Sequence, residues 1–309
     1  MLPFTLHQLR ILKAIATEKT FTKAAEILYL SQPSLSKQIK KLEESLDVIL
    51  LNREHNKISF TENGKIFLEY SERILALCEE SCRILIDLKN GDRGYLIIGA
   101  SQTIGTYLMP KILTGFTLKY PHIDLNIEID STRAIVESII NNEIDIAVIG
   151  GEIPNHQKKN LIIEHFAYDE LQLIVSKSHP AAKSNIININ DLYCLDFITL
   201  NYNSSVKKLV DKILINNQIQ PSRLNTILEL NSIEGIKTAV SSGLGVAFVS
   251  ASAIEKELEL GLIKVVQIEN LRIVRNISII SNSGLHKSSA FNFFYEDLIR
   301  LRTQSKRYD

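Results

Sequence analysis

Residues 21–43, with the sequence FTKAAEILYLSQPSLSKQIKKLE, constrain the fold more than any other segment of this 309-residue chain. The pattern predicts two short helices joined by a tight turn, with Ala24 and Ala25 small where the helices must cross closely. Ser31 can cap the second helix by accepting a hydrogen bond from a backbone N–H of its first turn. Pro33 lies in that turn, where a missing N–H costs nothing. The segment therefore favours a helix-turn-helix.

The second of these helices has one apolar and one polar face. Leu35, Ile39 and Leu42 fall at i, i+4 and i+7 and form a stripe that we expect to be buried. The opposite face carries Gln32, Ser34, Lys37, Gln38, Lys40 and Lys41. Short hydrogen-bonding and cationic groups of this kind reach base edges and phosphates, so the polar face favours DNA binding. The alternative is an ordinary amphipathic helical hairpin with a solvated basic face.

A β-hairpin is expected directly after this helix pair. Apolar residues at 50–51 and at 58 and 60 bracket the polar tip NREHNK. The pattern predicts a wing whose Arg53 and Lys57 contact the sugar–phosphate backbone of DNA.

A long helix is predicted from Glu62 to about Lys89, because no proline interrupts the segment and Thr61 can cap its start. Spacings of four and three alternate along it, as in the seam of a coiled coil. The seam consists of Asn63, Phe67, Tyr70, Ile74, Leu77, Ser81, Ile84 and Leu88. Packing against the chain's own core is one explanation of this stripe. A helix of this length between a small and a large domain favours dimerisation.

The composition predicts two domains and no membrane span. A length of 309 residues with 45% hydrophobic residues suffices for two cores, and no apolar run reaches the length of roughly 18 residues that a transmembrane helix needs. The start MLPFTLHQLRILK lacks the features of a signal peptide. Cys78, Cys82 and Cys194 lack metal-binding spacing, so we expect ordinary packing, with a redox sensor as the alternative.

The net charge is balanced, with 35 basic and 35 acidic residues, whereas a protein that only coats nucleic acid is normally basic. Residues 1–65 hold ten Lys or Arg and seven Asp or Glu, a net charge of +3. So modest a charge predicts weak non-specific binding, with sequence contacts and dimerisation supplementing the attraction to phosphates.

From about Gly94 onward, apolar β-branched runs alternate with helical patterns. The expected strands are YLIIG, DLNIEI, IDIAVIG, LQLIVS, FITL, NTILEL, GVAFVS and NISIIS, and the expected helices lie near 104–119, 132–141, 204–217 and 232–242. This alternation predicts parallel α/β layers. The run is long enough for two lobes, with the last strand and the final helix returning to the first lobe. Ligands of such folds bind in the crevice at the carboxyl ends of the strands.

Glycine and small hydroxyl residues gather at those strand ends. They lie at 99–103, 131–132 and 150–151 in the first lobe, and at 199–201 and 242–245 in the second. Backbone N–H groups and Ser or Thr hydroxyls suit a carboxylate or a phosphate. Helix caps and turns explain the same residues equally well. Arg133 is either a partner for an anion or a surface charge.

The sequence carries no catalytic motif. It contains no Gly-x-x-x-x-Gly-Lys-Ser/Thr loop, no Gly-x-Gly-x-x-Gly fingerprint and no His-Glu-x-x-His helix, and its seven histidines are scattered. We therefore expect no enzyme, no catalytic residue, no metal site and no cofactor. A small-molecule enzyme and an architectural DNA binder without an effector are the alternatives from other classes.

These segments together resemble the LysR-type transcriptional regulators over the whole chain. The matching features are the helix-turn-helix at 21–43, the wing ending at Phe60 and Thr61 with Gly64, the linker helix, and a sensor that opens with GASQTIGTYLMP. Within that family the chain is similar to the regulators of RuBisCO operons in cyanobacteria and red-lineage plastids. The segments LPFTLHQLRILKAIA, GASQTIGTYLMP, DSTR and GGEIP carry this second similarity.

The resemblance implies an α/β fold with an N-terminal all-α winged helix-turn-helix domain, a long linker helix, and a two-lobed effector domain like type II periplasmic binding proteins. The expected domains are the DNA-binding domain at 1–61, the linker and dimerisation helix at 62–90, and the effector domain at 91–309. Lobe I is expected at about 94–166 and 268–309, and lobe II at about 167–267.

The resemblance also assigns roles to particular residues. The implied DNA contacts are Gln32, Pro33, Ser34, Ser36, Lys37, Lys41 and Arg53. The implied effector contacts are Ser101, Thr103, Thr132, Thr199 and Asn201. Two residues depart from the family pattern: Asn56 replaces a second basic residue of the wing, and Leu51 replaces an aromatic one.

The expected function is a sequence-specific transcription regulator that responds to a small anionic metabolite and controls RuBisCO or other carbon-fixation genes, with an unrelated metabolic operon as the alternative. The expected partners are double-stranded promoter DNA, an effector such as a phosphorylated metabolite or NADPH, a second copy in a homodimer, a homotetramer built from two dimers, and RNA polymerase. No membrane partner is expected.

The amino-acid usage bears on the compartment. The chain holds 45 isoleucines against 16 alanines, a bias that fits an AT-rich coding genome better than a requirement of the fold. We expect the plastid stroma, with a bacterial cytoplasm as the alternative.

Overall fold

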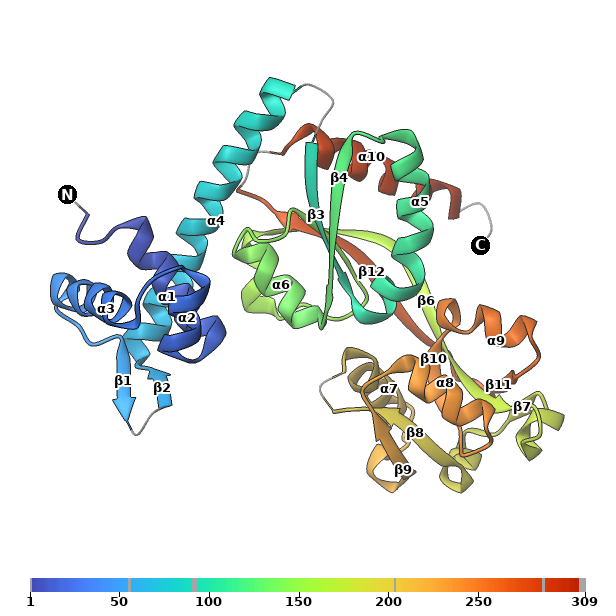
Figure 1. Cartoon of the computed structure of the whole chain (residues 1–309). Coiled ribbons are helices and arrows are strands. Elements are labelled where there is room, and N and C mark those ends of the chain that lie inside the picture. The colour runs from blue at the N-terminus through green and yellow to red at the C-terminus, as the bar shows by residue number, and fades with distance from the viewer. Residues whose placement is uncertain (1, 55–56, 91–93, 203, 285–286, 306–309) are drawn as a thin grey trace. The chain divides into compact units, whose positions relative to one another are not determined.

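A computed structural model describes residues 2–54, 57–90, 94–202, 204–284 and 287–305. The chain forms two compact units (Figure 1). The N-terminal unit comprises Met1–Asn90 with Asn141–Glu143, and the C-terminal unit comprises Gly91–Ile140 and Ile144–Asp309.

The N-terminal unit packs short helices and a hairpin at the start of one long helix. Its elements are α1 (Leu6–Glu18), α2 (Phe21–Ile27), α3 (Gln32–Leu46), β1 (Leu51–Glu54), β2 (Lys57–Phe60) and α4 (Glu62–Asn90). Hydroxyl side chains begin these helices: Ser31 accepts a hydrogen bond from the Ser34 backbone N–H at 3.3 Å, and Thr61 accepts one from Gly64 at 2.9 Å. The structure thus confirms both predicted helix starts.

The apolar stripe of α3 lies in the core of this unit. Leu35, Ile39 and Leu42 are fully buried, as predicted, and they share the cluster with Ala24 and Ala25 of α2. Burial of such a stripe, rather than intrinsic helix propensity, supplies most of the stability of short helices.

The predicted wing is present, as the antiparallel pair of β1 and β2 with Leu51 opposite Phe60. Two contacts fix it to the helices. The Glu43 carboxylate of α3 accepts hydrogen bonds from the backbone N–H groups of Leu50 and Leu51, at 2.8 and 3.1 Å. Gly64 of α4 lies so close to the Leu50 carbonyl that a Cβ would be 2.0 Å from its oxygen. Only glycine permits this approach.

The C-terminal unit begins with the elements of the first lobe: β3 (Gly94–Ser101), the π-helical turn η1 (Ile104–Leu108), α5 (Met109–Lys119), β4 (Ile123–Asp130), α6 (Thr132–Ile140), β5 (Ile146–Ile149), η2 (Asn155–Asn160) and β6 (Leu161–Ser176). The elements that follow are η3 (Pro180–Lys183), β7 (Ile186–Ile187), η4 (Ile189–Cys194), β8 (Asp196–Leu200), α7 (Ser205–Asn216), η5 (Pro221–Arg223), β9 (Asn225–Leu230), α8 (Ile233–Ser241), β10 (Ala247–Ser250), η6 (Ala251–Ala253), α9 (Glu255–Glu259), β11 (Ile263–Ile268), β12 (Ile273–Asn282) and α10 (Ser289–Ser305).

The main sheet is mixed, which corrects the expectation of parallel layers. Its strand order is β4-β3-β5-β12-β6-β11-β7, with β10 also paired to β6. β3 is parallel to β4 and β5, as expected, but β12 pairs antiparallel with both β5 and β6. The reason is topological: β12 returns the chain to the first lobe along the strand that left it, and so runs in the opposite direction.

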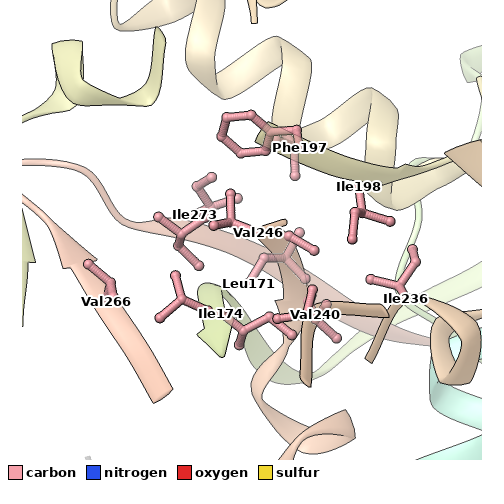
Figure 2. Close-up of a cluster of buried hydrophobic side chains, with 14 of the residues drawn as sticks. Leu171, Ile174, Phe197, Ile198, Ile236, Val240, Val246, Val266 and Ile273 are labelled. Carbon is pink, nitrogen blue, oxygen red and sulfur yellow. The ribbon is translucent and has the colours of Figure 1, made fainter. Parts of the chain in front are cut away.

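Each lobe has its own apolar core. In lobe I, α5 and α10 cover the sheet, and Phe116, Phe294 and Leu298 pack against Ile98. The final helix and late strand thus return to the first lobe, as predicted. In lobe II, Phe197, Ile198, Val240 and Val246 belong to one cluster, of which Figure 2 shows the interior.

Two long strands connect the lobes. β6 contributes Phe166 to the lobe I core and Leu171 to the lobe II core, and β12 contributes Ile277 and Ile273 to the same two cores. Figure 1 shows both strands running from one lobe into the other. The division of the chain at residues 61, 90, 166 and 267 remains a prediction. Among the described residues, no helix is long and apolar enough to cross a membrane.

Gly64→Ala is expected to destabilise the chain by about 1–3 kcal/mol, because the new Cβ collides with backbone that the wing cannot move cheaply. Gly115→Ala is the matched control: Gly115 lies on α5 with nothing within 4 Å of the place that a Cβ would take, so the substitution should be neutral or stabilising by up to about 1 kcal/mol. Urea unfolding followed by circular dichroism measures both changes. Equal unfolding midpoints for Gly64→Ala and the parent chain would contradict the predicted close approach.

Candidate DNA-binding surface and effector site

The polar face of α3 is exposed. Gln32, Pro33, Ser34, Lys37 and Lys41 are exposed, whereas Ser36 is half-buried. The buried stripe on the other side of the helix fixes which side chains point outward. The face therefore presents amide, hydroxyl and ammonium groups, the chemistry that contacts bases and phosphates.

The assignment of wing contacts rests on side chains beyond the described set. Arg53 lies on β1 and Lys57 on β2, but their side chains are not among those that the structure describes. The same holds for the tip residues His55 and Asn56.

Two sides of α4 differ in exposure. Ser71 and Leu75 are buried, while Tyr70 and Leu77 on the predicted seam are each 53% exposed. Ile74 and Phe67 of the seam are half-buried, and Asn63 and Ser81 are exposed. The side chains of Ile84 and Leu88 lie outside the described set. A largely uncovered seam on this chain agrees with the dimerisation hypothesis, which remains a prediction.

Three predicted effector residues lie together at the carboxyl ends of lobe I strands. Ser101 ends β3, Thr103 follows it, and Thr132 begins α6 directly after β4. All three are buried. The Ser101 hydroxyl accepts a hydrogen bond from the Gly150 backbone N–H at 3.1 Å, which ties β3 to the loop after β5.

The Thr132 hydroxyl is buried without a hydrogen-bond partner. A Cβ on Gly151 would be 2.4 Å from this hydroxyl and 3.0 Å from the Cβ of Ser205. Ser205 is the first residue of α7 in lobe II, so the two lobes meet at Gly151. A buried hydroxyl without a partner is costly. It lies beside a helix N-terminus, which favours anions.

The two predicted residues of lobe II lie elsewhere. The Thr199 hydroxyl is also buried without a partner, in a pocket of about 30 Å³ under α7 whose lining residues all belong to lobe II, among them Lys207 and Asp211. The amide nitrogen of Asn201 donates to the Asn231 side chain at 2.7 Å, joining the ends of β8 and β9. The structure thus brings Ser101 and Thr132 together but does not place Thr199 or Asn201 in contact with them.

Sequence analysis missed a buried ion pair on the two connecting strands. The Nε of Arg275 on β12 donates to the Asp169 carboxylate on β6 at 2.7 Å, and the two side chains are 4% and 5% exposed. The Ser250 hydroxyl at the end of β10 also donates to Asp169, at 2.7 Å. Charged residues inside otherwise apolar strand segments were the only sequence signal for this pair.

A second missed cluster joins the lobes at another point. The Tyr107 hydroxyl of η1 donates to Glu234 of α8 at 2.6 Å, and the buried Lys237 ammonium contacts Glu234 and Glu257 at 2.8 and 2.9 Å. Burial and the bond to Glu234 raise the pKa of Tyr107 well above its usual range. Burial alone would raise the pKa of Glu234, but hydrogen bonds from Lys237 and Tyr107 lower it. Tyr107 therefore remains a donor and Glu234 a carboxylate.

A metal centre finds no support in the described part of the chain, where no group of three or more His, Cys, Asp or Glu residues could hold an ion. All three cysteines are free; Cys78 is half-buried, and Cys82 and Cys194 are exposed.

Comparison with known families covers both units. Residues 6–65 match the family described as bacterial regulatory helix-turn-helix protein, lysR family. Residues 89–301 match the family described as LysR substrate binding domain. The order of the two matches is the order of the two units in the fold.

Individual proteins and solved structures are similar to this chain as well. A protein of Phaeodactylum tricornutum named "Probable RuBisCO transcriptional regulator" is 64% identical over 304 residues, which cover 98% of this chain and 99% of the relative. Full-length CbnR, solved with its target DNA, superposes with a TM-score of 0.70 at 23% identity over 96% of this chain and 100% of CbnR. The CcmR regulatory domain of Synechocystis PCC6803, solved with 2-PG, gives a TM-score of 0.61 at 24% identity over 68% of this chain and 98% of that domain.

At these identities the two solved structures show the fold alone: CbnR that of the whole chain, a winged helix-turn-helix followed by a two-lobed domain, and the CcmR domain that of the two-lobed part. The two family matches and the 64% identical relative also show the family of the chain. The chain belongs to the LysR family, and it is a DNA-binding transcriptional regulator, not an enzyme.

Proposed function

We propose that this regulator controls RuBisCO or other carbon-fixation genes in response to a small anionic metabolite. The assignment of these target genes is supported by the name of the Phaeodactylum tricornutum relative and by its 64% identity to this chain. An unrelated metabolic operon is the alternative, and a promoter-binding assay decides between the two.

The observation that carries the effector response is the unpartnered Thr132 hydroxyl between the lobes. Buried polar groups in folded proteins are nearly always hydrogen-bonded. This one faces Gly151 and the first residue of α7, where a ligand oxygen would receive its hydrogen bond. We assign Ser101, Thr103 and Thr132 of lobe I to the effector, and we add Thr199 and Asn201 of lobe II by analogy with the family.

The ligand class follows from the donors beside Gly150 and Gly151. Hydroxyls and a helix N-terminus suit a carboxylate or phosphate, and a phosphorylated metabolite or NADPH carries such groups. The CcmR regulatory domain, which has a similar fold, was solved with 2-PG.

On the DNA side, the exposed face of α3 supports contacts by Gln32, Pro33, Ser34, Lys37 and Lys41, and we add Ser36 and Arg53 by analogy with the family. The exposed seam residues Tyr70 and Leu77 of α4 support a homodimer, and two dimers would form a tetramer that spans a longer operator. RNA polymerase is then a partner at the promoter.

The switch requires an effector that binds two arrangements of the lobes with different affinity. A change in the angle between the lobes would alter the spacing of the DNA-binding domains in the oligomer. We place the protein in the plastid stroma, on its isoleucine-rich composition and its algal relative; a bacterial cytoplasm is the alternative.

Gln32→Ala and Lys37→Ala separate base contacts from phosphate contacts. Loss of a good base contact should cost about 1–3 kcal/mol on the operator and relax sequence choice. Equal weakening on operator and random DNA would instead indicate a phosphate contact. Lys158→Ala, an exposed lysine of the C-terminal unit, is the control. Fluorescence anisotropy at fixed salt measures all three, and operator affinity unchanged by both α3 substitutions would refute the assignment.

Thr132→Val should remove the effector response without loss of stability. The methyl group replaces a hydroxyl whose burial without a partner costs about 1–3 kcal/mol, so the unliganded variant should melt at the same temperature or higher. Metabolite binding should weaken about tenfold or more. Exposed Thr114→Val is the control. Differential scanning fluorimetry with phosphorylated sugars and nicotinamide nucleotides reports both effects; an undiminished ligand-induced shift removes Thr132 from the site.

Leu77→Asp should abolish the dimer, because a carboxylate in an apolar seam must be desolvated when two helices pair. The side chain is 53% exposed in the single chain, so the fold should survive. Leu118→Asp, at an 81% exposed position of α5, is the control. Sedimentation velocity measures the mass of the particle in solution. A Leu77→Asp variant that stays dimeric would show that the seam of α4 does not form the dimer interface.

A further inference from the structure

The Arg275–Asp169 pair lies where the two lobes are joined. The two residues are directly opposite each other in the pairing of β12 with β6, the strands that connect the lobes. Asp169 is bound by Ser250 of lobe II as well as by Arg275. On the lobe I side of the pair, a Cβ at Gly150 would lie 3.0 Å from the guanidinium carbon of Arg275. The guanidinium therefore rests on the backbone of the loop that follows β5.

The hydrogen bonds of this pair are incomplete. Nε of Arg275 is bonded to Asp169, yet Nη2 is buried without a partner. A buried ion pair contributes to stability only when its remaining hydrogen bonds are satisfied. An orphaned guanidinium N–H therefore makes this pair a poor structural element, and a buried donor of this kind is satisfied by a water, an ion or a ligand.

Neighbouring groups also present hydrogen-bond donors beside Gly150 and Gly151. Gly150 donates its N–H to the Ser101 oxygen, which leaves the Ser101 hydroxyl proton to donate. The Thr132 hydroxyl lies beside the next residue, Gly151, and has no partner. Donors thus face the Gly150–Gly151 segment from β3, α6 and β12. The carboxylate of Asp169 is already engaged by two donors. An excess of donors over acceptors matches a ligand group that only accepts hydrogen bonds.

We propose that Arg275 binds the anionic group of the effector through Nη2, beside Gly150. This inference rests on the proposed function and names the residue that binds the charged group of the ligand. Guanidinium is the side chain best matched to carboxylate and phosphate oxygens. The shared chemistry is an oxyanion, and the experiment's probes distinguish a phosphate from a carboxylate.

The same contact would couple binding to the connecting strands. Arg275 holds Asp169 on β6, and Asp169 holds Ser250 of lobe II. A ligand on Nη2 joins this chain of bonds to the Gly150 loop of lobe I. The effector thereby favours one arrangement of β6 and β12 over others, which is the differential affinity that a switch needs.

Isothermal titration calorimetry on the full-length chain tests the proposal, with 2-PG, NADPH, inorganic phosphate and shikimate as probes. Arg275→Lys retains the charge opposite Asp169 but loses the planar second donor. Gly150→Ala presses on the guanidinium without changing any charge, since its Cβ would lie 3.1 Å from both Nε and Nη1. Each variant should bind the preferred anion about 10- to 100-fold more weakly.

Each control makes the same kind of substitution at a site away from the proposed contact. Arg272→Lys alters an exposed arginine on the chain just before β12, which pairs with Glu170 of β6 at 2.9 Å. Gly115→Ala adds a methyl group in open space. Both should bind within about twofold of the parent chain, a difference well below 1 kcal/mol. Circular dichroism and thermal unfolding establish that each variant is folded.

The outcomes separate the two proposals. Anion binding by a folded Arg275→Lys variant at the parent affinity overturns this inference; if Thr132→Val still weakens binding, the proposed function stands. Should Arg275→Lys fail to fold, Gly150→Ala decides by the same criterion. Binding of no probe by the parent chain overturns the proposed anionic effector, and this inference with it.

Discussion

The pairing of β6 with β12 is the constraint on which the C-terminal unit depends. These strands carry the chain between the lobes, contribute to both cores, and make the sheet mixed. Any change in the angle between the lobes must bend or twist them. Arg275 and Asp169 face each other on these strands, and Gly150, Ser101 and Thr132 are gathered beside them. The proposed binding site and the connection between the lobes are therefore built from the same few residues.

The C-terminal unit keeps several buried polar groups at a cost in stability, whereas the N-terminal unit keeps its polar groups exposed. In the C-terminal unit, the hydroxyls of Thr132 and Thr199 and one N–H of Arg275 are buried without partners. Such groups destabilise a folded chain. Those of Thr132 and Arg275 lie beside Gly151 and Gly150, whereas Thr199 lines a separate pocket within lobe II. In the N-terminal unit, one face of α3 packs into the core of the unit, and the other face exposes amide, hydroxyl and ammonium groups. Gly64 and Glu43 hold the wing against that helix.

Local patterns in the sequence predicted most of the fold. The stripe of Leu35, Ile39 and Leu42, the caps Ser31 and Thr61, and the wing depend on residues close in sequence, and all are confirmed. The first half of β6 was missed, because its sequence LIIEHFAYDE mixes charged with apolar residues. The predicted position of Ser101 and Thr132 at the ends of strands is confirmed, because strand ends are recognisable in the sequence; their role in effector binding came from the family resemblance and remains a proposal. Arg275 and Asp169 were missed, since partners 106 residues apart leave no periodic signal.

The most direct test of the central claim is binding of the purified protein to a RuBisCO operon promoter, measured by fluorescence anisotropy at fixed salt with and without phosphorylated sugars and nicotinamide nucleotides. We expect tight, sequence-selective binding whose affinity or stoichiometry one anionic metabolite changes. Selective binding that ignores every metabolite would contradict the effector site between the lobes. Binding with no preference over random DNA would contradict the role assigned to α3.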